Sequence, residues 1–305
     1  MIGYWSIGLT LAAGVLAGTL LSCGPDTLTG RVNLSGSSTL SSLAQKTADR
    51  WKTVHPSVDV NVEAIGSDAG LERLVRYHDA DFALMSRPLT PADYDTAKSV
   101  HEVLIALPVA WDAVCLVVPS TDTWASSLTS AQAARAFTNA SKWSDLDPSW
   151  PAKPIHRFVL GPNSGTADVF SSALFPQNRT AFRSAPDVQA SEDDHILARG
   201  VAGVEGSLGF LGWTTVQEVS PTLRMLALDG VAPTPQTIRD HSYGLPRQLW
   251  LVTTADVLKN NSAAISLARF LFDQYPMLAA ETGLIGLNDQ ERRAAEQTLN
   301  ESGLN

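Results

Sequence analysis

The sequence predicts an α/β protein built from two lobes. Three observations lead to this prediction: the chain has 305 residues, short apolar runs alternate with helical stretches, and two long apolar segments stand where the chain would change lobes. A chain of this length suits two lobes better than a single core. Apolar residues make up 44% of the sequence, so each lobe has enough of them to bury a core.

The first part of the chain is typical of short strands that alternate with helices. Strands are expected where apolar residues alternate, and helices where they recur at helical spacing. Thr90 followed by Pro91 indicates a helix start, because proline fits the first helical position. In order, we expect a strand at 31–36, a helix at 42–54, a strand at 58–66, a helix at 66–78, a strand at 80–86 and a helix at 90–100.

The segment 101–120 is apolar along most of its length. It is too long for one ordinary strand, and Pro108 interrupts it. We expect it to cross into a second lobe and the apolar strand 246–254 to cross back. The second lobe would hold a helix at 128–137, a strand at 155–160, helices at 164–175 and 191–202, and strands at 206–213 and 223–228.

Two C-terminal helices, 262–276 and 288–300, would complete the first lobe. Lobe I is therefore predicted at 31–111 and 249–305, and lobe II at 112–248. Two crossings between two α/β lobes are the plan of a hinged binding protein.

The first 23 residues are predicted to be a leader outside the fold. Residues 2–21 are apolar and uncharged, and they are followed by Ser22 and Cys23. A cysteine after small residues and an apolar run resembles a bacterial lipoprotein processing site, so cleavage would leave Cys23 as a lipidated N-terminus. A retained membrane helix is the alternative, because the run is long enough to span a bilayer. Residues 24–30 would be a linker, and the body would lie outside the cytoplasmic membrane, anchored to it.

The charge balance and the absence of catalytic motifs exclude several classes of function. A net charge of −9 argues against nucleic-acid binding, which needs a basic face, but it permits an anion site built on backbone N–H dipoles. Cys115 has no disulfide partner once Cys23 is lipidated, and its apolar neighbours indicate a small buried side chain. The six histidines lack metal-ligand spacing and no nucleophile motif appears, so we expect no enzyme, no metal and no cofactor.

Four turns, each directly before a predicted helix, are rich in hydrogen-bond donors. They are Ser37-Ser38-Thr39, Gly66-Ser67, Ser86-Arg87 and Ser164-Gly165-Thr166. A helix N-terminus offers unpaired N–H groups and a partial positive charge, which suits an oxyanion. Arg87 would add a guanidinium fork for a tetrahedral oxyanion. Each turn alone is more simply a helix cap or a surface turn, and sequence spacing cannot show whether the four converge.

Several segments, in order, resemble the periplasmic phosphate-binding proteins of the bacterial phosphate ABC importer. The likeness extends from Arg31 to Leu287. The matching segments are VNLSGSSTL, DFALMSRPLTPADY, LPVAWDAVCLVVPSTDTWASSLTSAQ, KWSDLDPSWP, LGPNSGTADVF, SEDDHILARGVAGVEGSLGFLGW and LPRQLWLVTT. This resemblance implies a type II, Venus-flytrap periplasmic binding protein with two interlobe crossover strands and phosphate between the lobes.

The resemblance also implies a set of phosphate-binding residues: Ser37, Ser38, Thr39, Ser67, Ser86, Arg87, Ser164, Gly165 and Thr166. Another branch of the family has, in place of Arg87, an Asp that accepts the proton of phosphate, and it has an Arg where this chain has Leu160. The proton acceptor must therefore come from elsewhere. The candidates are Asp112, Asp168, Asp193 and Asp194. Asn163 and His195 also depart from the family pattern.

The function implied is capture of inorganic phosphate by a lipid-anchored monomer that delivers it to the permease subunits of an ABC importer. One alternative keeps the fold and changes the ligand, to give a binder or sensor of another oxyanion such as sulfate or molybdate. A second alternative is a secreted phosphatase-like hydrolase, which would need a nucleophile beside a base or a metal.

Overall fold

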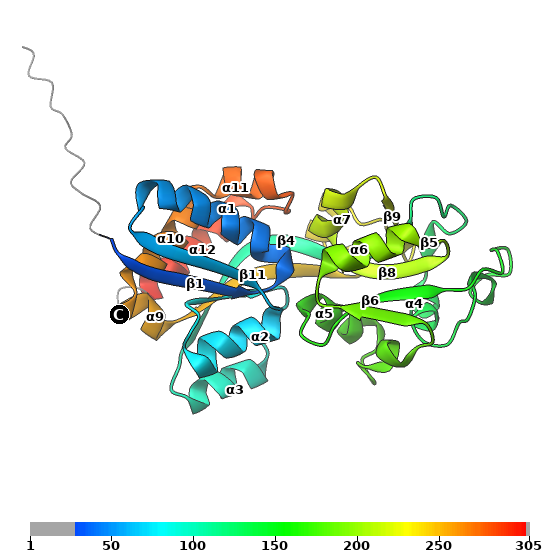
Figure 1. The fold of residues 1–305 in the computed structure, drawn as a ribbon, viewed down its shortest axis with the longest axis horizontal. Coiled ribbons are helices and arrows are strands. Elements are labelled where there is room, and N and C mark those ends of the chain that lie inside the picture. The colour runs from blue at the N-terminus through cyan, green and yellow to red at the C-terminus, as the bar shows by residue number, and fades with distance from the viewer. Residues whose placement is uncertain (1–27, 303–305) are drawn as a thin grey trace, which may run out of the picture.

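The computed structural model describes residues 28–302, so the predicted leader, Cys23 and most of the linker lie outside the described residues. Two α/β lobes lie side by side and are joined by two strands, β4 (Leu104–Pro119) and β11 (Pro246–Thr254) (Figure 1). These strands pair with each other antiparallel, and β4 continues into the second lobe, where it pairs with β8 (Ser207–Gly212). The predicted two-lobe α/β fold with two crossover strands is confirmed.

Lobe I is built on a sheet with the strand order β2-β1-β3-β11-β4. β1 lies between β2 and β3 and is parallel to both, so their carboxyl ends meet at the edge that faces lobe II. α1, α10, α11 and α12 lie on one side of this sheet, and α2 and α3 on the other (Figure 1). The elements are β1 (Gly30–Gly36), α1 (Ser38–Val54), β2 (Val58–Ala64), α2 (Ser67–Glu72), the π-helix η1 (Arg73–Tyr77), β3 (Phe82–Met85), α3 (Pro91–Ser99), α9 (Ala255–Asn260), α10 (Ser262–Asp273), α11 (Tyr275–Thr282) and α12 (Asp289–Ser302).

Lobe II continues the sheet through β4-β8-β6-β7, with β9 paired to β4 and a small separate pair of β10 and β5. β6 is parallel to both β7 and β8, which requires helical crossovers between them. The elements are β5 (Ser127–Leu128), α4 (Ser130–Ala136), η2 (Trp143–Asp145), β6 (His156–Leu160), α5 (Gly165–Leu174), η3 (Ala181–Ser184), β7 (Val188–Ser191), α6 (Asp194–Gly203), α7 (Trp213–Val219), β9 (Leu223–Met225), β10 (Ala227–Leu228) and α8 (Pro235–Arg239).

The long apolar segment is a single strand after all. β4 runs for 16 residues, and the register against β11 shifts where Pro108 pairs with Trp250 and Ala110 with Leu249. Proline has no N–H for a sheet ladder, so it is tolerated at such an irregularity. One unbroken strand can therefore serve both lobes.

The core is divided between the two lobes. One set of buried apolar residues comes from 113–245 with Ile285, and the sets in lobe I come from 32–110 and 249–299. Phe170 stacks on Phe210 at the centre of the lobe II core, with ring centroids 3.9 Å apart. Cys115 is fully buried in the same core, as predicted, and burial raises the pKa of its thiol. Each lobe therefore has its own core.

Arg157 is a buried cation in lobe II that is held by backbone carbonyls. It is 1% exposed, and its guanidinium donates to the carbonyls of Ala136 (2.6 Å), Ile155 (3.0 Å), Pro186 (2.7 Å) and Ala140. It thereby ties the end of α4 to the start of β6.

We predict that Arg157→Met destabilises the protein without weakening ligand binding. The variant leaves buried carbonyls without donors, which costs about 3 kcal/mol. The melting temperature should then fall by roughly 5–10 °C in calorimetry, since larger domains shift by a few degrees per kcal/mol. A melting temperature within a degree of wild type would show that these bonds contribute little.

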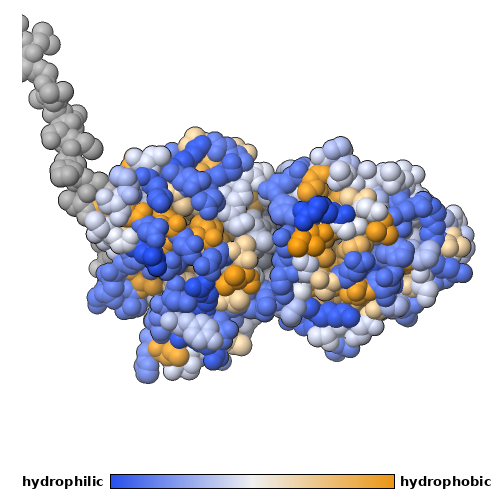
Figure 2. Space-filling view, in the orientation of Figure 1, coloured by the Kyte–Doolittle hydropathy of each residue, from blue (hydrophilic) through white to orange (hydrophobic). Residues whose placement is uncertain are grey.

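The face drawn in Figure 2 is mostly polar, with apolar residues in small separate groups and the two lobes in contact along a narrow boundary. Within residues 28–302, the helices are all too short or too polar to cross a bilayer.

Candidate functional site

All four predicted donor turns contribute residues to the boundary between the lobes. Ser67 and Ser86, in lobe I, place their hydroxyl oxygens 3.1 Å apart. A Cβ atom on Gly165, at the start of α5 in lobe II, would lie 2.5 Å from Ser86 Oγ and 2.7 Å from Ser67 Oγ. Thr39 and Thr166 come from opposite lobes and both accept hydrogen bonds from one guanidinium, that of Arg247. The convergence that spacing could not show is present in the structure.

The hydroxyls at the start of α1 are not used to cap that helix. Ser37 occupies the N-cap position, but its side chain accepts no bond from the first turn. Ser38 Oγ instead donates across the boundary to Asp194 Oδ1, at 3.1 Å. The first turn of α1 therefore presents N–H groups and hydroxyls to lobe II, which an oxyanion can use as donors.

Arg247 supplies the cation at this boundary. Its side chain is 1% exposed and projects from β11, one of the two crossover strands. Nε donates to Asp112 Oδ2 at 3.0 Å and Nη2 bonds the same oxygen, while Asp112 Oδ1 accepts the backbone N–H of Thr214 at 3.2 Å. Asp112 lies on β4, so the ion pair joins the two crossover strands.

Arg247 was not among the ligand residues predicted from the sequence. One signal was available, because an Arg and an Asp each stand within one of the two apolar crossover segments. Charged groups are rarely fully buried unless they are paired, so these two were candidates for a buried pair.

Asp194 is the second carboxylate buried at the boundary. It is 2% exposed, and its oxygens accept from Ser38 Oγ at 3.1 Å and from Thr215 Oγ1 at 3.3 Å. Burial raises the pKa of the Asp194 carboxyl above its ordinary value, although the charge of Arg247 and the bond from Ser38 act in the opposite direction.

The other two candidate acceptors have structural partners. Asp193 is the N-cap of α6 and accepts the N–H groups of His195 and Ile196. Asp168 pairs with Arg179 at the rim and is one-third exposed. This leaves Asp112 and Asp194 as the buried carboxylates among the four, and Asp112 is already committed to Arg247.

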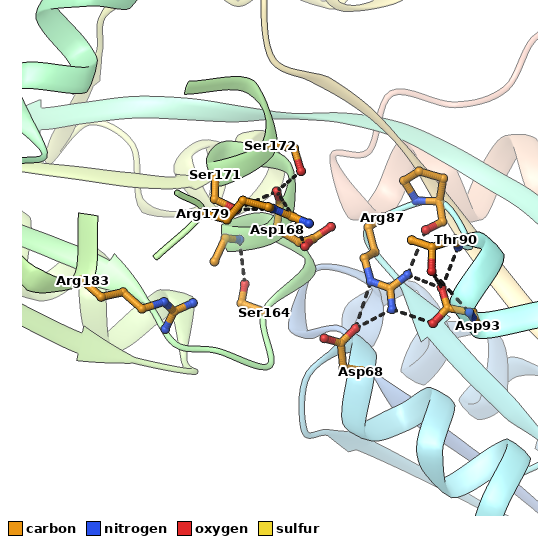
Figure 3. Close-up of polar contacts among 12 residues, drawn as sticks. Asp68, Arg87, Thr90, Asp93, Ser164, Asp168, Ser171, Ser172, Arg179 and Arg183 are labelled. Carbon is orange, nitrogen blue, oxygen red and sulfur yellow. Dashed lines mark hydrogen bonds and ion pairs between the residues drawn. The ribbon is translucent and has the colours of Figure 1, made fainter. Parts of the chain in front are cut away.

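Two of the predicted ligands lie differently from what the sequence suggested. Ser164 caps α5, since its hydroxyl accepts the N–H of Ala167 at 3.3 Å. Arg87 remains in lobe I, where its guanidinium points to Asp68 and Asp93 (Figure 3). Arg247, rather than Arg87, is the guanidinium that bonds residues of both lobes.

The boundary is closely packed. Gly66 has φ +92°, and a Cβ there would lie 2.7 Å from the carbonyl oxygen of Asn163 in lobe II. Only glycine combines that backbone conformation with such a close approach.

The arrangement offers neutral donors, two helix N-termini and one guanidinium to a small anion enclosed by both lobes. Among residues 28–302, no group of three or more His, Cys, Asp or Glu side chains is placed to hold a metal ion.

Comparisons with known proteins agree with this architecture. A family model described as PBP superfamily domain matches residues 24–274. Protein SphX of Synechococcus elongatus is 28% identical over 277 residues, which cover 87% of this chain and 80% of that protein. The phosphate-binding protein PstS of Staphylococcus aureus is 24% identical, with 93% of this chain and 86% of that protein covered. The crystal structure of an ABC-type phosphate transport receptor from Vibrio cholerae has the same fold, with a TM-score of 0.68, 22% identity, and coverage of 84% of this chain and 100% of that one.

Proposed function

Because this chain belongs to the PBP superfamily, we propose that it is a binding protein that captures inorganic phosphate between its lobes for an ABC importer. The observation that carries the proposal is the guanidinium of Arg247, which bonds Thr39 of lobe I and Thr166 of lobe II at once. The names of the relatives, a phosphate-binding protein and a phosphate transport receptor, support the same ligand.

The site replaces the water that phosphate loses on binding. Phosphate is strongly hydrated, so enclosing it requires many donors. The hydroxyls of Ser38, Thr39, Ser67 and Thr166 and the N–H groups at the starts of α1 and α5 supply neutral donors, while Arg247 neutralises charge and forms charge-assisted bonds. Ligand held by both lobes favours the closed arrangement over the open one.

Asp194 gives the site a way to select a protonated anion. Monohydrogen phosphate carries an O–H that can donate to a carboxylate, whereas sulfate is fully ionised and would place a bare oxygen against it. The carboxylate oxygen and the sulfate oxygen are both acceptors, so neither would gain a hydrogen bond and the two charges would repel each other. This is costly inside a protein. We assign Asp194 as the group that accepts the proton of phosphate.

We predict that Asp194→Asn relaxes the rejection of sulfate. The amide can donate where the carboxylate cannot, so sulfate affinity should rise about tenfold, the effect expected of one regained bond. Calorimetry with sulfate and phosphate measures both affinities in each variant. Asp193→Asn is the matched control, since that side chain caps α6 outside the site. Equal phosphate-to-sulfate ratios in wild type and Asp194→Asn would remove Asp194 from this role.

The pH dependence of sulfate binding has a definite sign. Burial raises the pKa of Asp194, so acidification protonates it at a higher pH than an ordinary aspartate. Below that pKa the neutral carboxyl becomes an O–H donor. Wild-type sulfate affinity should therefore rise as the pH falls through the raised pKa, and Asp194→Asn should lack this step.

Direct calorimetric titration tests the function itself. The wild-type protein should bind phosphate far more tightly than sulfate or molybdate near neutral pH. Sulfate binding as tight as phosphate would favour the second candidate, an oxyanion binder of different selectivity. Turnover of a phosphomonoester would instead support the hydrolase alternative.

The proposal extends to how the protein is placed and how it moves. Residues 31–111 with 249–305 and residues 112–248 would move as two bodies about β4 and β11. The protein would act as a monomer outside the cytoplasmic membrane, held there by lipid on Cys23, and would present its closed form to the importer's permease subunits.

A further inference from the structure

The guanidinium of Arg87 has no donor left for a ligand. Nε and Nη2 donate to Asp68 Oδ1 at 2.9 and 2.7 Å. Nη1 donates to Asp93 Oδ2 at 2.7 Å, and Nη2 donates to Asp93 Oδ1 at 3.2 Å. Nη1 also donates to the carbonyl of Pro88 at 2.9 Å. A guanidinium carries five N–H groups, and these five bonds use them all.

The two carboxylates also outweigh the charge of Arg87. Burial acts to lower the pKa of the guanidinium, but the bonds and charges of Asp93 and Asp68 hold it above its ordinary value. The cluster of Asp68, Arg87 and Asp93 carries one positive and two negative charges, so it would repel an anion rather than attract it.

Arg87 connects the elements that carry two of the proposed ligand hydroxyls. Asp68 directly follows Ser67 at the start of α2, and Arg87 directly follows Ser86 at the end of β3. Figure 3 shows the guanidinium between Asp68 and Asp93, with Ser164 and Asp168 of lobe II across the boundary. Its bonds to Asp68 therefore hold the turn of Ser86 against the turn of Ser67.

The serine pair depends on this arrangement. The Ser86 N–H donates to Ser67 Oγ at 3.1 Å, and the two hydroxyl oxygens are also 3.1 Å apart. Both serines are buried, and both hydroxyls face Gly165. A small shift between the turns would change where these hydroxyls point. Small displacements of ligand-binding groups have large effects on affinity.

Asp93 fixes the other end of the cluster. Its carboxylate accepts the N–H and the hydroxyl of Thr90 at 2.7 and 2.8 Å in the capping box of α3, in addition to the bonds from Arg87. The start of α3 thus serves as a rigid support for the guanidinium.

We propose that Arg87 is a positioning residue that fixes the Ser67–Ser86 hydroxyl pair for the anion through Asp68 and Asp93, without contacting the anion itself. This inference rests on the proposed phosphate function, and wild-type phosphate binding establishes that function separately before any variant is compared.

A double-mutant cycle on phosphate Kd tests the proposal. Arg87→Gln and Ser67→Ala should each raise Kd, by about tenfold for a lost or misplaced donor. If Arg87 acts through the serine pair, the double variant should be no more than about twofold weaker than Ser67→Ala alone, since coupled residues are not additive. Additive effects, with the double variant about 100-fold weaker, would overturn the proposal. If Arg87→Gln raised the phosphate Kd only through a general loss of stability, its effect would also add to that of Ser67→Ala.

Asp68→Asn distinguishes positioning from direct contact by the sign of its effect. Asp68 is 49% exposed, so the variant should fold. If Arg87 positions the serines, loss of this carboxylate raises the phosphate Kd. If Arg87 binds the anion, the variant weakens the bonds that hold two of its donors and removes a negative charge, so Kd falls. An unchanged or lower phosphate Kd contradicts the proposal. The Asp68→Asn measurement distinguishes positioning from direct contact even if Arg87→Gln fails to fold.

Arg73→Gln is the matched control. Arg73 is also in lobe I and also bridges two carboxylates, Glu63 and Asp79, but neither lies beside a proposed ligand residue. Its phosphate Kd should equal that of wild type. A Kd raised as much as in Arg87→Gln would mean that any broken ion-pair cluster in lobe I has the same effect, and the specific role of Arg87 would fail.

Discussion

Replacing Arg247 by methionine is expected to raise the phosphate Kd by about 1,000-fold, the upper range for removal of a buried charged partner. The variant removes a buried cation that bonds both lobes, together with its bonds to Thr39 and Thr166. It also leaves the carboxylate of Asp112, which is fully buried, without its counter-charge and free to repel the anion.

Two further variants separate binding from folding in this experiment. Arg247→Met with Asp112→Asn removes the unpaired charge, so stability should partly recover while phosphate binding stays lost. Arg179→Met removes a rim arginine that pairs with Asp168 beside the site, and its Kd should change by less than about threefold, as for an exposed ion pair. Calorimetric titration measures all three. Near-wild-type binding by Arg247→Met would place the anion elsewhere.

Gly165→Ala is expected to weaken phosphate binding by about 10- to 100-fold, equivalent to about 1.4–2.8 kcal/mol. The added Cβ would lie 2.5 Å from Ser86 Oγ and 2.7 Å from Ser67 Oγ, so the lobes could not approach as closely as they do here. The clash would form only when the lobes close, so an open form would be unaffected. The melting temperature without phosphate should therefore stay at or near the wild-type value.

Gly203→Ala is the control for this substitution. It also lies in a helix of lobe II, but a Cβ at this position has no neighbour within 4 Å. Its phosphate Kd should match wild type. Small-angle scattering with and without phosphate reports closure directly, and Gly165→Ala should show a smaller compaction than wild type. Full compaction with unchanged affinity would mean that the serine pair moves aside at little cost.

The alternation of apolar runs with helical spacing pointed to the two-lobe fold, and the family resemblance implied it as well. The strands at 31–36 and 58–66 were recognisable because apolar and polar residues alternate along them, and the two crossover segments because they are largely apolar. The short elements were missed, among them β7 and α7, because a few residues give no clear period. The predicted helix at 262–276 is interrupted after Asp273, and α11 begins at Tyr275 with Pro276 in its first turn.

The neutral donors of the proposed site could be proposed from the sequence, whereas its buried ion pair could not. Hydroxyls before a helix can be recognised locally, because the cap and the turn are properties of adjacent residues. The partner of a buried charge cannot be recognised locally. Asp112 and Arg247 are 135 positions apart in the sequence and meet only through the pairing of β4 with β11. The sequence suggested Arg87 as the cation because the partners that it has in the structure, Asp68 and Asp93, also lie on separate elements.

The most direct test is the structure of the protein crystallised with phosphate. We expect a tetrahedral anion between the lobes, with oxygens about 3 Å from the Arg247 guanidinium and the hydroxyls of Thr39 and Thr166, and an Arg87 still bonded to Asp68 and Asp93. Phosphate bound to Arg87, with Arg247 left paired to Asp112 and away from the anion, would contradict it.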